Sequence, residues 1–256
     1  MAVLYSSAEI AAIGRAGAVC ARILSEAAGA ARAGVSGLEI DALARRRLSE
    51  AGAESVLAEQ VGPSGTFRGA ISVSTGRTVA NGTPAARAFA PGELVRLDLA
   101  VRLDGWVCDA ATTVAAGEPS PEAQRVLAGA QVALDATIAS MSPGVRWSEA
   151  VRAGRAAAAA AGVHVADWPW GHGVGRRLHE PPVLAADCAS PAADFELRRG
   201  MVLAVEPIVL GAPAPLAGGR DGWSIVAPCG RAPVAACEER TVAIVEAAVE
   251  ILTRLR

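Results

Sequence analysis

The sequence contains no lysine, so all 24 of its basic residues are arginine. Aromatic residues are also scarce, at 4% of 256 residues, and 26 acidic residues nearly balance the basic ones. No basic run is interleaved with aromatic residues, which gives no support to a nucleic-acid-binding surface. The missing lysine and the abundant alanine indicate a codon bias and carry no functional meaning. We therefore expect a small or peptide-like partner.

A long hydrophobic run is absent as well. The alanine-rich stretch 156–161 is much shorter than the roughly 20 apolar residues that cross a bilayer. Residues 1–10 contain no charged stretch followed by an apolar core. We therefore expect a soluble, cytoplasmic protein without a membrane partner.

The cysteines follow no pattern. Five are scattered along the chain and no two form a Cys-x-x-Cys pair, which disfavours a disulfide framework and a zinc knuckle. We interpret them as small buried hydrophobic residues. They are Cys20, Cys108, Cys188, Cys229 and Cys237.

Hydrophobic residues make up 52% of the chain, enough for a substantial core. Apolar residues at three- and four-residue spacing predict helices over 7–32, 38–51, 121–141 and 147–161. Sequence rich in β-forming residues follows each helix pair. No linker rich in proline, glycine or serine divides the chain, so we predict one domain over residues 1–256.

The two halves share a sequence pattern. Six residues recur at an offset of 110: Gly34, Val35, Glu39, Arg45, Ala51 and Gly52 match Gly144, Val145, Glu149, Arg155, Ala161 and Gly162. Asp98 and Glu206 each end an apolar strand six residues after a glycine. This pattern predicts an internal duplication, with pseudo-repeats over roughly 7–115 and 121–246. We expect an α+β fold in which the halves form a curved antiparallel sheet, with helices outside and a cleft near the pseudo-symmetry axis.

Two acidic residues lie on neighbouring strands of the first half. Asp104-Gly105 is a hairpin signal between strands predicted over 94–101 and 106–114. The turn sets Asp98 opposite residue 111 and Asp109 opposite residue 100, so both carboxylates share one face. In a mostly apolar sheet they would repel each other and lose hydration unless a cation lay between them. We interpret the pair as metal ligands.

The second half contains further candidates. Glycines on both sides of His172 permit a close approach of backbone and ligand, whereas His164 has no such context and is interpreted as an ordinary residue. Glu206 follows the apolar run 201–205 and needs a partner. A strand predicted over 234–245 carries Glu238 and Glu239, which point to opposite faces if the strand is regular. At most one of them is a ligand.

Together these residues resemble the type I methionine aminopeptidases, which have the pita-bread metallopeptidase fold, along nearly the whole chain. The matched segments are Val95-Arg96-Leu97-Asp98, Cys108-Asp109, Gly171-His172-Gly173-Val174-Gly175, Leu178-His179-Glu180, Val205-Glu206-Pro207, Asp221-Gly222-Trp223 and Glu239-Arg240-Thr241-Val242. Each motif alone is weak, but their shared order and spacing make a specific signal.

The resemblance implies a site with two divalent metal ions. Asp98 would bind one ion, His172 and Glu206 the other, and Asp109 and Glu239 would bridge them. Glu239 is preferred to Glu238 because Glu-Arg-Thr-Val keeps the family's spacing to Ile251-Leu252-Thr253. One imidazole among oxygen ligands suits Mn, Fe, Co or Zn.

The resemblance also implies roles for residues around the metals. Glu206 would carry a proton to the leaving amine, and His179 would donate to the substrate carbonyl oxygen. Phe67, Leu178 and Trp223 fall near positions that shape the family's side-chain pocket, and ordinary core packing is the alternative for all three.

The sequence departs from the family at one catalytic position. Family members carry a histidine in a His-Gly-x-Pro segment, where it contacts the substrate amide nitrogen, and this chain has Asn81 there. An amide cannot carry a proton at neutral pH, so a proton-passing role is lost. Trp168 and Trp170 are also expected to crowd the approach to His172.

We therefore predict a dinuclear metal-dependent hydrolase that removes an N-terminal residue from a peptide. One alternative is a family member with a specialised small amide or imine substrate, and another is a non-catalytic binding module. We expect a monomer, with a dimer as the alternative.

Overall fold

The computed structural model describes residues 2–190, 193–230, 232–246 and 248–255. Its helices are α1 (Ser7–Ala30), α2 (Gly37–Glu50), η1 (Leu57–Glu59, a 3-10 turn), α3 (Pro121–Ala139) and α4 (Trp147–Ala160). The four predicted α-helices are confirmed, and each ends one or two residues earlier than predicted.

Short strands and one long hairpin make up the rest of the regular structure. The strands are β1 (Glu54–Ser55), β2 (Val61–Gly62), β3 (Gly65–Thr66), β4 (Ser72–Thr75), β5 (Thr78–Ala80), β6 (Leu94–Leu103), β7 (Trp106–Ala115), β8 (His164–Val165), β9 (Gly171–Gly173), β10 (Glu180–Val183), β11 (Val202–Val205), β12 (Ile208–Leu210), β13 (Ala217–Gly218), β14 (Ile225–Val226), β15 (Ala235–Cys237), β16 (Arg240–Ile244) and β17 (Val249–Ile251). The pairings between these strands are antiparallel.

The ends of the helices follow from local sequence. Ser36 begins α2 with a capping box: its hydroxyl accepts from the Glu39 N–H at 3.3 Å, and the Glu39 carboxylate accepts from the Ser36 N–H at 2.8 Å. Glu149 makes the equivalent carboxylate contact at the start of α4. Gly52 and Gly162 follow α2 and α4 with φ of 62° and 70°. A residue with a side chain rarely adopts this left-handed conformation.

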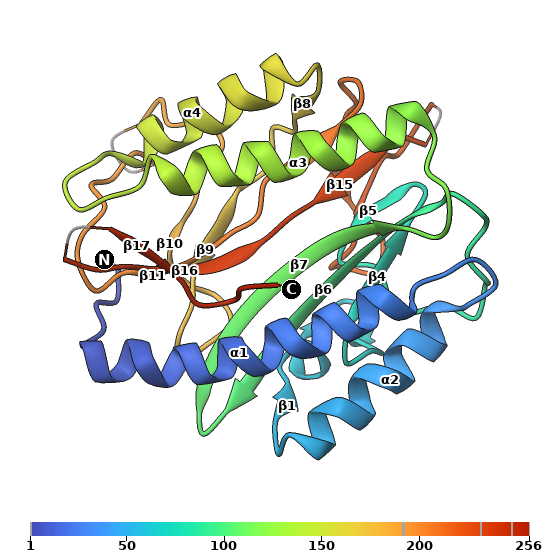
Figure 1. Cartoon of the computed structure of the whole chain (residues 1–256), viewed down its shortest axis with the longest axis horizontal. Helices are drawn as coiled ribbons and strands as arrows, with labels where there is room; N and C mark the ends of the chain where they lie inside the picture. Colours follow the sequence, from blue (N-terminus) through green and yellow to red (C-terminus); the bar gives the residue numbers. More distant parts are fainter. Residues whose placement is uncertain (1, 191–192, 231, 247, 256) are drawn as a thin grey trace.

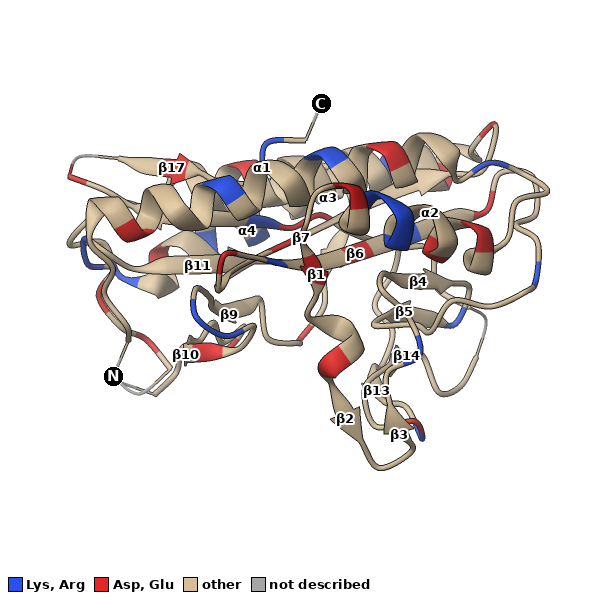
Figure 2. Cartoon of the chain, turned by 90° about the horizontal axis from the view of Figure 1, so that it is seen from below, with Lys and Arg blue, Asp and Glu red and all other residues tan. Residues whose placement is uncertain are grey.

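The helices cover one side of the strands (Figure 1), and the short strands β2, β3, β9, β10, β13 and β14 lie on the other side (Figure 2). Leu24 of α1 and Ile40 of α2 pack in one cluster with Leu97 of β6. Val126 of α3 packs in another cluster with Val209 of β12. The helices therefore bury their apolar faces on the strands, and α1 also packs against the second half, where Ile13 shares a cluster with Val202. The opposite side of the strands is left for a site.

The two halves repeat the same backbone contacts. Residues 34–35 exchange two hydrogen bonds with Phe89, at 3.0 and 2.7 Å, and residues 144–145 exchange the same two with Leu197, at 2.8 Å each. These contacts favour the predicted duplication. A single domain over the whole chain stays a prediction.

The long hairpin has the predicted register. Leu103 pairs with Trp106, Asp98 with Ala111, and Ala100 with Asp109. Asp98 and Asp109 therefore lie diagonally across one face, because side chains alternate between faces along a strand. The turn residue Asp104 adopts a left-handed φ of 51°, as an Asp-Gly hairpin turn requires.

Two threonine side chains join the halves, together with a backbone hydrogen bond from the Glu239 N–H to the Ala111 carbonyl at 3.0 Å. The Thr113 hydroxyl bridges the carbonyl and the N–H of Cys237, at 2.9 Å each. The Thr241 hydroxyl bridges the carbonyl and the N–H of Asp109, at 2.7 and 3.0 Å. Strand β7 therefore lies against β15 and β16, and the acidic residues of the two halves come within reach of one another.

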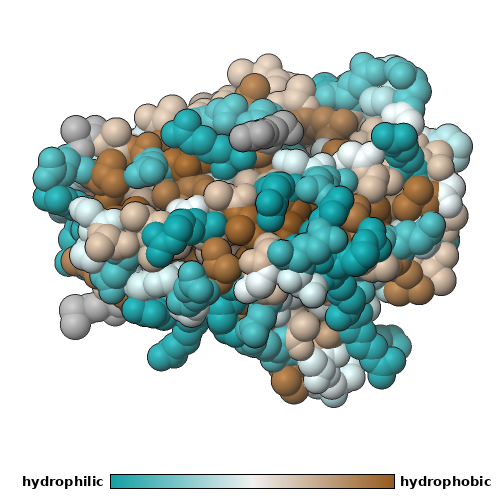
Figure 3. All heavy atoms as spheres, turned by 60° about the horizontal axis from the view of Figure 1, so that its bottom comes forward, coloured by the Kyte–Doolittle hydropathy of each residue, from teal (hydrophilic) through white to brown (hydrophobic). Residues whose placement is uncertain are grey.

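Other expectations concern the surface. On the face shown in Figure 3, hydrophilic and hydrophobic residues are interspersed. None of the helices within the described residues combines the length and hydrophobicity that a bilayer crossing requires. The prediction of buried cysteines is wrong for Cys188, which is half-buried, and for Cys229, which is exposed. Both lie in loops, and Cys188 packs against the edge of a core cluster.

Candidate metal centre

A cavity of about 280 Å³ opens on the side of the strands opposite the helices. Its lining residues come from both halves of the chain. They are Leu57, Gln60, Val61, Gly62, Phe67, Ser72, Asn81, Asp98, Asp109, His172, Leu178, His179, Glu206, Gly222 and Trp223. Every site residue predicted from the sequence except Glu239 is in this set, and Glu239 lies directly behind it.

Asp98 and Asp109 enter the cavity from β6 and β7. Asp109 is buried, and one carboxylate oxygen of each residue is inaccessible to solvent and has no hydrogen-bond partner among the described residues. Ser72 of β4 pairs directly with Asp98, and its hydroxyl oxygen is also buried without a partner. A buried polar atom without a partner is destabilising, so these atoms point to a ligand in the cavity.

His172 enters from the central residue of β9. A side chain at the preceding Gly171, whose φ is 127°, would place its Cβ 1.9 Å from the carbonyl oxygen of Ala204. The glycine therefore lets β9 pair closely with β11. The His172 Nδ1 lies 2.9 Å from the Gly173 carbonyl oxygen, so a proton on Nδ1 satisfies that carbonyl and leaves the Nε2 lone pair for a ligand.

The Nε2 atom of His172 faces two carboxylates. It lies 3.8 Å from Oδ2 of Asp109 and 3.8 Å from Oε1 of Glu206. Burial, with a smaller effect of His179, lowers the pKa of His172 to about 4. The imidazole is therefore neutral near pH 7, so it does not neutralise these carboxylates and is in the state that binds metals.

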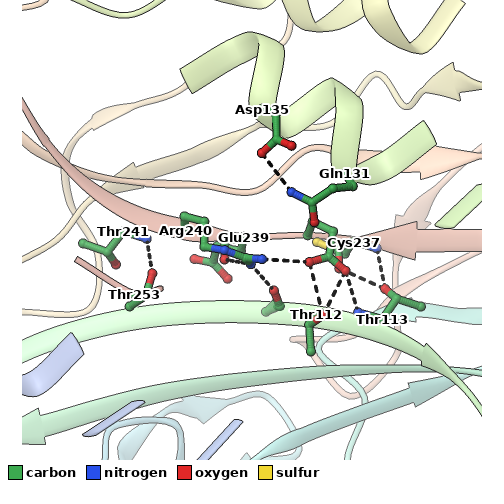
Figure 4. A network of polar contacts seen from close by, with 11 residues as sticks. Thr112, Thr113, Gln131, Asp135, Cys237, Glu239, Arg240, Thr241 and Thr253 are labelled. Carbon is green, nitrogen blue, oxygen red and sulfur yellow. Dashed lines mark hydrogen bonds and ion pairs between the residues drawn. The ribbon is translucent and has the colours of Figure 1, made fainter. Parts of the chain in front are cut away.

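Glu238 and Glu239 interrupt the strand predicted over 234–245, which is divided into β15 and β16. The Glu238 carboxylate accepts from the Thr113 N–H at 2.9 Å and the Thr112 hydroxyl at 3.0 Å, and it forms an ion pair with Arg240 at 3.3 Å. Figure 4 shows Thr112, Thr113 and Arg240 of this network, with the contact between Thr113 and Cys237 beside them. Glu238 is therefore fully engaged away from the cavity.

The Glu239 carboxylate has the opposite environment. It is 1% exposed, and its Oε1 atom has no partner among the described residues. Ligand atoms of Asp109, His172 and Glu239 all lie within 4.8 Å of one another. The two adjacent glutamates thus face different surroundings, as predicted, although they lie between β15 and β16 and not within one regular strand.

Burial of these carboxylates makes their charged forms costly. It raises the pKa of Asp109 to about 6 and, with a contribution from Asp109, that of Glu206 to about 8. Burial and the neighbouring carboxylates raise the pKa of Asp98 and of Glu239 well above the ordinary range. The group can be fully ionised near neutral pH only with added positive charge.

The donor set fits divalent cations. It offers carboxylate oxygens and one neutral imidazole, which suit transition metals such as Mn, Fe, Co and Zn. Three of the buried atoms without a hydrogen-bond partner, on Asp98, Asp109 and Glu239, belong to this set. Such a cation can polarise a carbonyl group and lower the pKa of water, which is the chemistry of hydrolysis.

His179 and Asn81 lie at the rim. The His179 side chain is exposed, and its ring centroid lies 4.4 Å from that of His172. Partial burial of its inner side lowers the pKa of His179. Asn81 has a left-handed φ of 56°, a conformation that asparagine tolerates better than most residues.

Phe67, Leu178 and Trp223 line one end of the cavity. The rings of Phe67 and Trp223 meet edge to face, with centroids 5.7 Å apart. A Cβ at Gly62 would lie 2.7 Å from the Trp223 ring, so the glycine permits this contact. Sequence reasoning missed Gln60, Gly62 and Ser72, which no motif in the sequence singles out.

A second cavity, of about 500 Å³, adjoins the first. The two share Asn81, His172, His179 and Glu206. Trp168 lines this second cavity, in agreement with the expectation that it crowds His172.

The same expectation is wrong for Trp170. Its side chain is 0% exposed and packs edge to face against Trp147 in the core, with ring centroids 6.3 Å apart. Side chains alternate along an extended segment, so residues 168 and 170 would point to the same face of a regular strand. Their different burial therefore requires an irregular backbone, and Pro169 lies between them. His164, interpreted as ordinary, is exposed at the start of β8.

Known proteins resemble the chain along most of its length. The sequence matches metallopeptidase family M24 over residues 11–246. It is 32% identical to a methionine aminopeptidase of Aquifex aeolicus, over 98% of each chain. It is 31% identical to methionine aminopeptidase 1 of Bacillus subtilis, over 87% of each. The solved structure of a methionine aminopeptidase from Thermotoga maritima has a TM-score of 0.90 at 27% identity and covers 99% of this chain and 100% of its own.

Proposed function

The chain belongs to metallopeptidase family M24, and we propose that it is a metal-dependent aminopeptidase that removes the N-terminal residue from a peptide. One observation supports this most strongly. Among the described residues, carboxylate oxygens of Asp98, Asp109 and Glu239 are buried without partners; Asp98 and Asp109 line the cavity with His172, and Glu239 lies near the ligand atoms of Asp109 and His172. The members of such a cluster can all be ionised near neutral pH only when added positive charge, such as that of divalent cations, neutralises them.

Five residues would hold two divalent ions. We assign Asp98 to one ion, His172 and Glu206 to the other, and Asp109 and Glu239 to both. When bound, the metals supply Lewis acidity and a water of lowered pKa. The contacts of His172 with Asp109 and Glu206, at 3.8 Å each, support this grouping.

The protein's own residues would orient the peptide and move protons. His179, exposed at the rim, would donate a hydrogen bond to the carbonyl oxygen as negative charge develops there. Glu206, which lines the cavity beside His172, would take up a proton and pass it to the leaving amine. Asn81 would hold the peptide by hydrogen bonds alone.

The two cavities would divide the substrate between them. The cavity of about 280 Å³ would take the N-terminal side chain against Phe67, Leu178 and Trp223. The cavity of about 500 Å³ would take the following residues. The residues shared by both cavities would then surround the bond to be cleaved.

Release of methionine from a Met-Ala-Ser peptide tests the proposal. We expect turnover with added Mn or Co and loss of turnover after removal of the metal by a chelator. Absence of turnover by protein with full metal occupancy would reject general methionine removal. Metal analysis of the purified protein separates an enzyme from a binding module, because a module without chemistry has no need to keep two ions.

A second candidate is an enzyme for a specialised small amide or imine. Asn81 favours it, because a peptidase that needs a proton-passing imidazole at this position would be impaired. A panel of N-terminally varied peptides and small amides, assayed with the same metal, distinguishes the two. We also propose that the protein is cytoplasmic and monomeric. Light scattering of the purified protein measures its molar mass and so tests whether it is a monomer.

A further inference from the structure

Glu180, next to His179, has a buried carboxylate that the proposed chemistry does not use. It is 9% exposed. Its Oε2 atom accepts from the Tyr5 hydroxyl at 2.7 Å, and its Oε1 atom accepts from the backbone N–H groups of Arg176 and Arg177 at 2.9 Å each. One side chain therefore fixes both ends of the loop that carries His179.

Tyr5 is itself held firmly, although it lies 175 residues away in sequence. Its side chain is 7% exposed and meets the Trp106 ring edge to face, with centroids 5.8 Å apart. Its N–H donates to the Gly200 carbonyl at 2.8 Å. A Cβ at Gly175 would lie 2.4 Å from the Tyr5 hydroxyl, so that glycine admits the ring. Tyr5 is thus held in one position and can anchor the loop that carries His179.

Burial and the hydrogen bond to Glu180 raise the pKa of Tyr5. The hydroxyl therefore stays protonated and donates to the carboxylate. The same oxygen accepts from the Arg176 N–H at 3.1 Å. On the other side of the loop, the Val107 N–H donates to the Gly175 carbonyl at 2.7 Å, and the Arg176 guanidinium lies 3.4 Å from the Trp106 ring centroid.

The His179 imidazole has no such support of its own. Within the part of the chain that the structure describes, no hydrogen bond to a ring nitrogen of His179 occurs, and its aromatic contact is with the His172 ring. Its position is therefore set by the backbone that leads into Glu180. Catalytic groups must hold their geometry closely, since a shift of about 1 Å can cost about 100-fold in rate.

We propose that Tyr5 and Glu180 are positioning residues that hold His179 in register with the substrate carbonyl. The proposal rests on the proposed function of His179 as a donor to that carbonyl. It adds a role for the N-terminal segment, which contributes no residue to the lining of either cavity. Neither residue touches the substrate.

Tyr5→Phe tests the proposal because it removes the hydroxyl and keeps the ring against Trp106. We expect kcat to fall about 10- to 100-fold, with KM and metal content unchanged, since a donor to developing charge acts in the transition state. Glu180→Gln should act in the same direction. Thr137→Val is the matched control, because Thr137 also has a buried hydroxyl, which donates to the Ala133 carbonyl at 2.7 Å in α3.

A double-mutant cycle separates positioning from general destabilisation. In a His179→Ala background, Tyr5→Phe should change kcat by less than about twofold, because the group it positions is gone. An equal loss of kcat in both backgrounds, or an equal loss in Thr137→Val, would overturn the proposal.

Amide exchange gives a readout independent of turnover. Tyr5→Phe should speed exchange of the Arg176 and Arg177 amides relative to Thr137→Val, because Glu180, which accepts from both amides, loses its hydrogen bond from Tyr5, and the Arg176 amide also loses the Tyr5 oxygen as an acceptor. Unchanged exchange of these amides would overturn the proposal that Tyr5 and Glu180 hold the loop. A wild-type protein that cleaves no peptide would instead overturn the proposed function, and the exchange result would still decide whether Tyr5 and Glu180 order the loop.

Discussion

Glu238 and Glu239 are neighbours in sequence, but their carboxylates have opposite environments. Glu238 receives hydrogen bonds from Thr112 and Thr113 and pairs with Arg240. Glu239 is equally buried but has an oxygen without a partner among the described residues, near ligand atoms of Asp109 and His172. One carboxylate holds the halves together, and the other is available for a cation.

Glu239→Gln should therefore lower metal content and reduce activity by more than about 100-fold, beyond the loss typical of a residue that only supports a ligand. Glu238→Gln is the matched control. It should keep its metal and lose about 1–3 kcal/mol of stability, because buried donors lose a charged acceptor. Metal analysis and thermal unfolding of both variants check this, and equal metal loss in the two would contradict the assignment.

Asn81→His should raise kcat/KM for peptides by at least about 10-fold, because general acid–base groups contribute about 100- to 10,000-fold. The backbone permits the change, since histidine is among the residues that adopt the left-handed conformation found here. Asn81→Ala, which can neither donate nor pass a proton, should not raise the rate. Steady-state kinetics of the wild type, Asn81→His and Asn81→Ala check this. An Asn81→His variant that is no faster than the wild type would contradict the prediction.

The metal-free protein should lose stability as the pH rises from about 4.5 to about 8. The folded pKa values of Asp109 and Glu206 are raised, from 3.8 to about 6 and from 4.5 to about 8. The folded state then binds more protons than the unfolded state in this window, so its stability decreases with pH. A pKa difference of one between the folded and unfolded states corresponds to about 1.4 kcal/mol, and the fall should amount to a few kcal/mol.

Saturating divalent metal should reverse the trend, because ligands bind metal in their deprotonated forms and affinity increases with pH. Thermal unfolding between about pH 5 and pH 8, with a chelator and with Mn, measures both effects. A metal-free protein whose melting temperature climbs over this range would argue against the buried acidic cluster.

Trp168 and Trp170 should respond differently to replacement by alanine. Trp170 is fully buried against Trp147, and its loss should cost about 3–5 kcal/mol. Trp168 lines the second cavity, so its loss should cost about 1 kcal/mol and raise KM for longer peptides. Denaturant unfolding and kinetics on two- and four-residue peptides check this. A KM that stays the same in Trp168→Ala would exclude the second cavity as a peptide site.

Local signals predicted much of the first half of the site. A two-residue turn fixes which residues face each other across a hairpin, so the register of Asp98 and Asp109 could be counted from Asp104-Gly105. The helices could be predicted because their apolar spacing and capping residues are local as well. These features depend on only a few neighbouring residues.

Contacts between distant segments could not be predicted in the same way. The partner of Glu180 is Tyr5, and no sequence pattern links two residues so far apart. The burial of Trp170 depends on α4, which packs on it through Trp147. Gln60 and Ser72 reach the cavity from a loop and a short strand, whose direction depends on tertiary packing. The choice of Glu239 came from family resemblance, since alternation alone left both glutamates open.

The candidate ligands are divided between two lobes, which are the two halves of the chain described above. Asp98 and Asp109 come from β6 and β7, whereas His172, Glu206 and Glu239 come from the second lobe. Cation binding and closure of the lobes are therefore linked equilibria, and occupancy would strengthen closure by RT ln(1 + [L]/Kd). Either lobe alone would have only part of the ligand set. The amount of bound metal would therefore report how tightly the two lobes are held together.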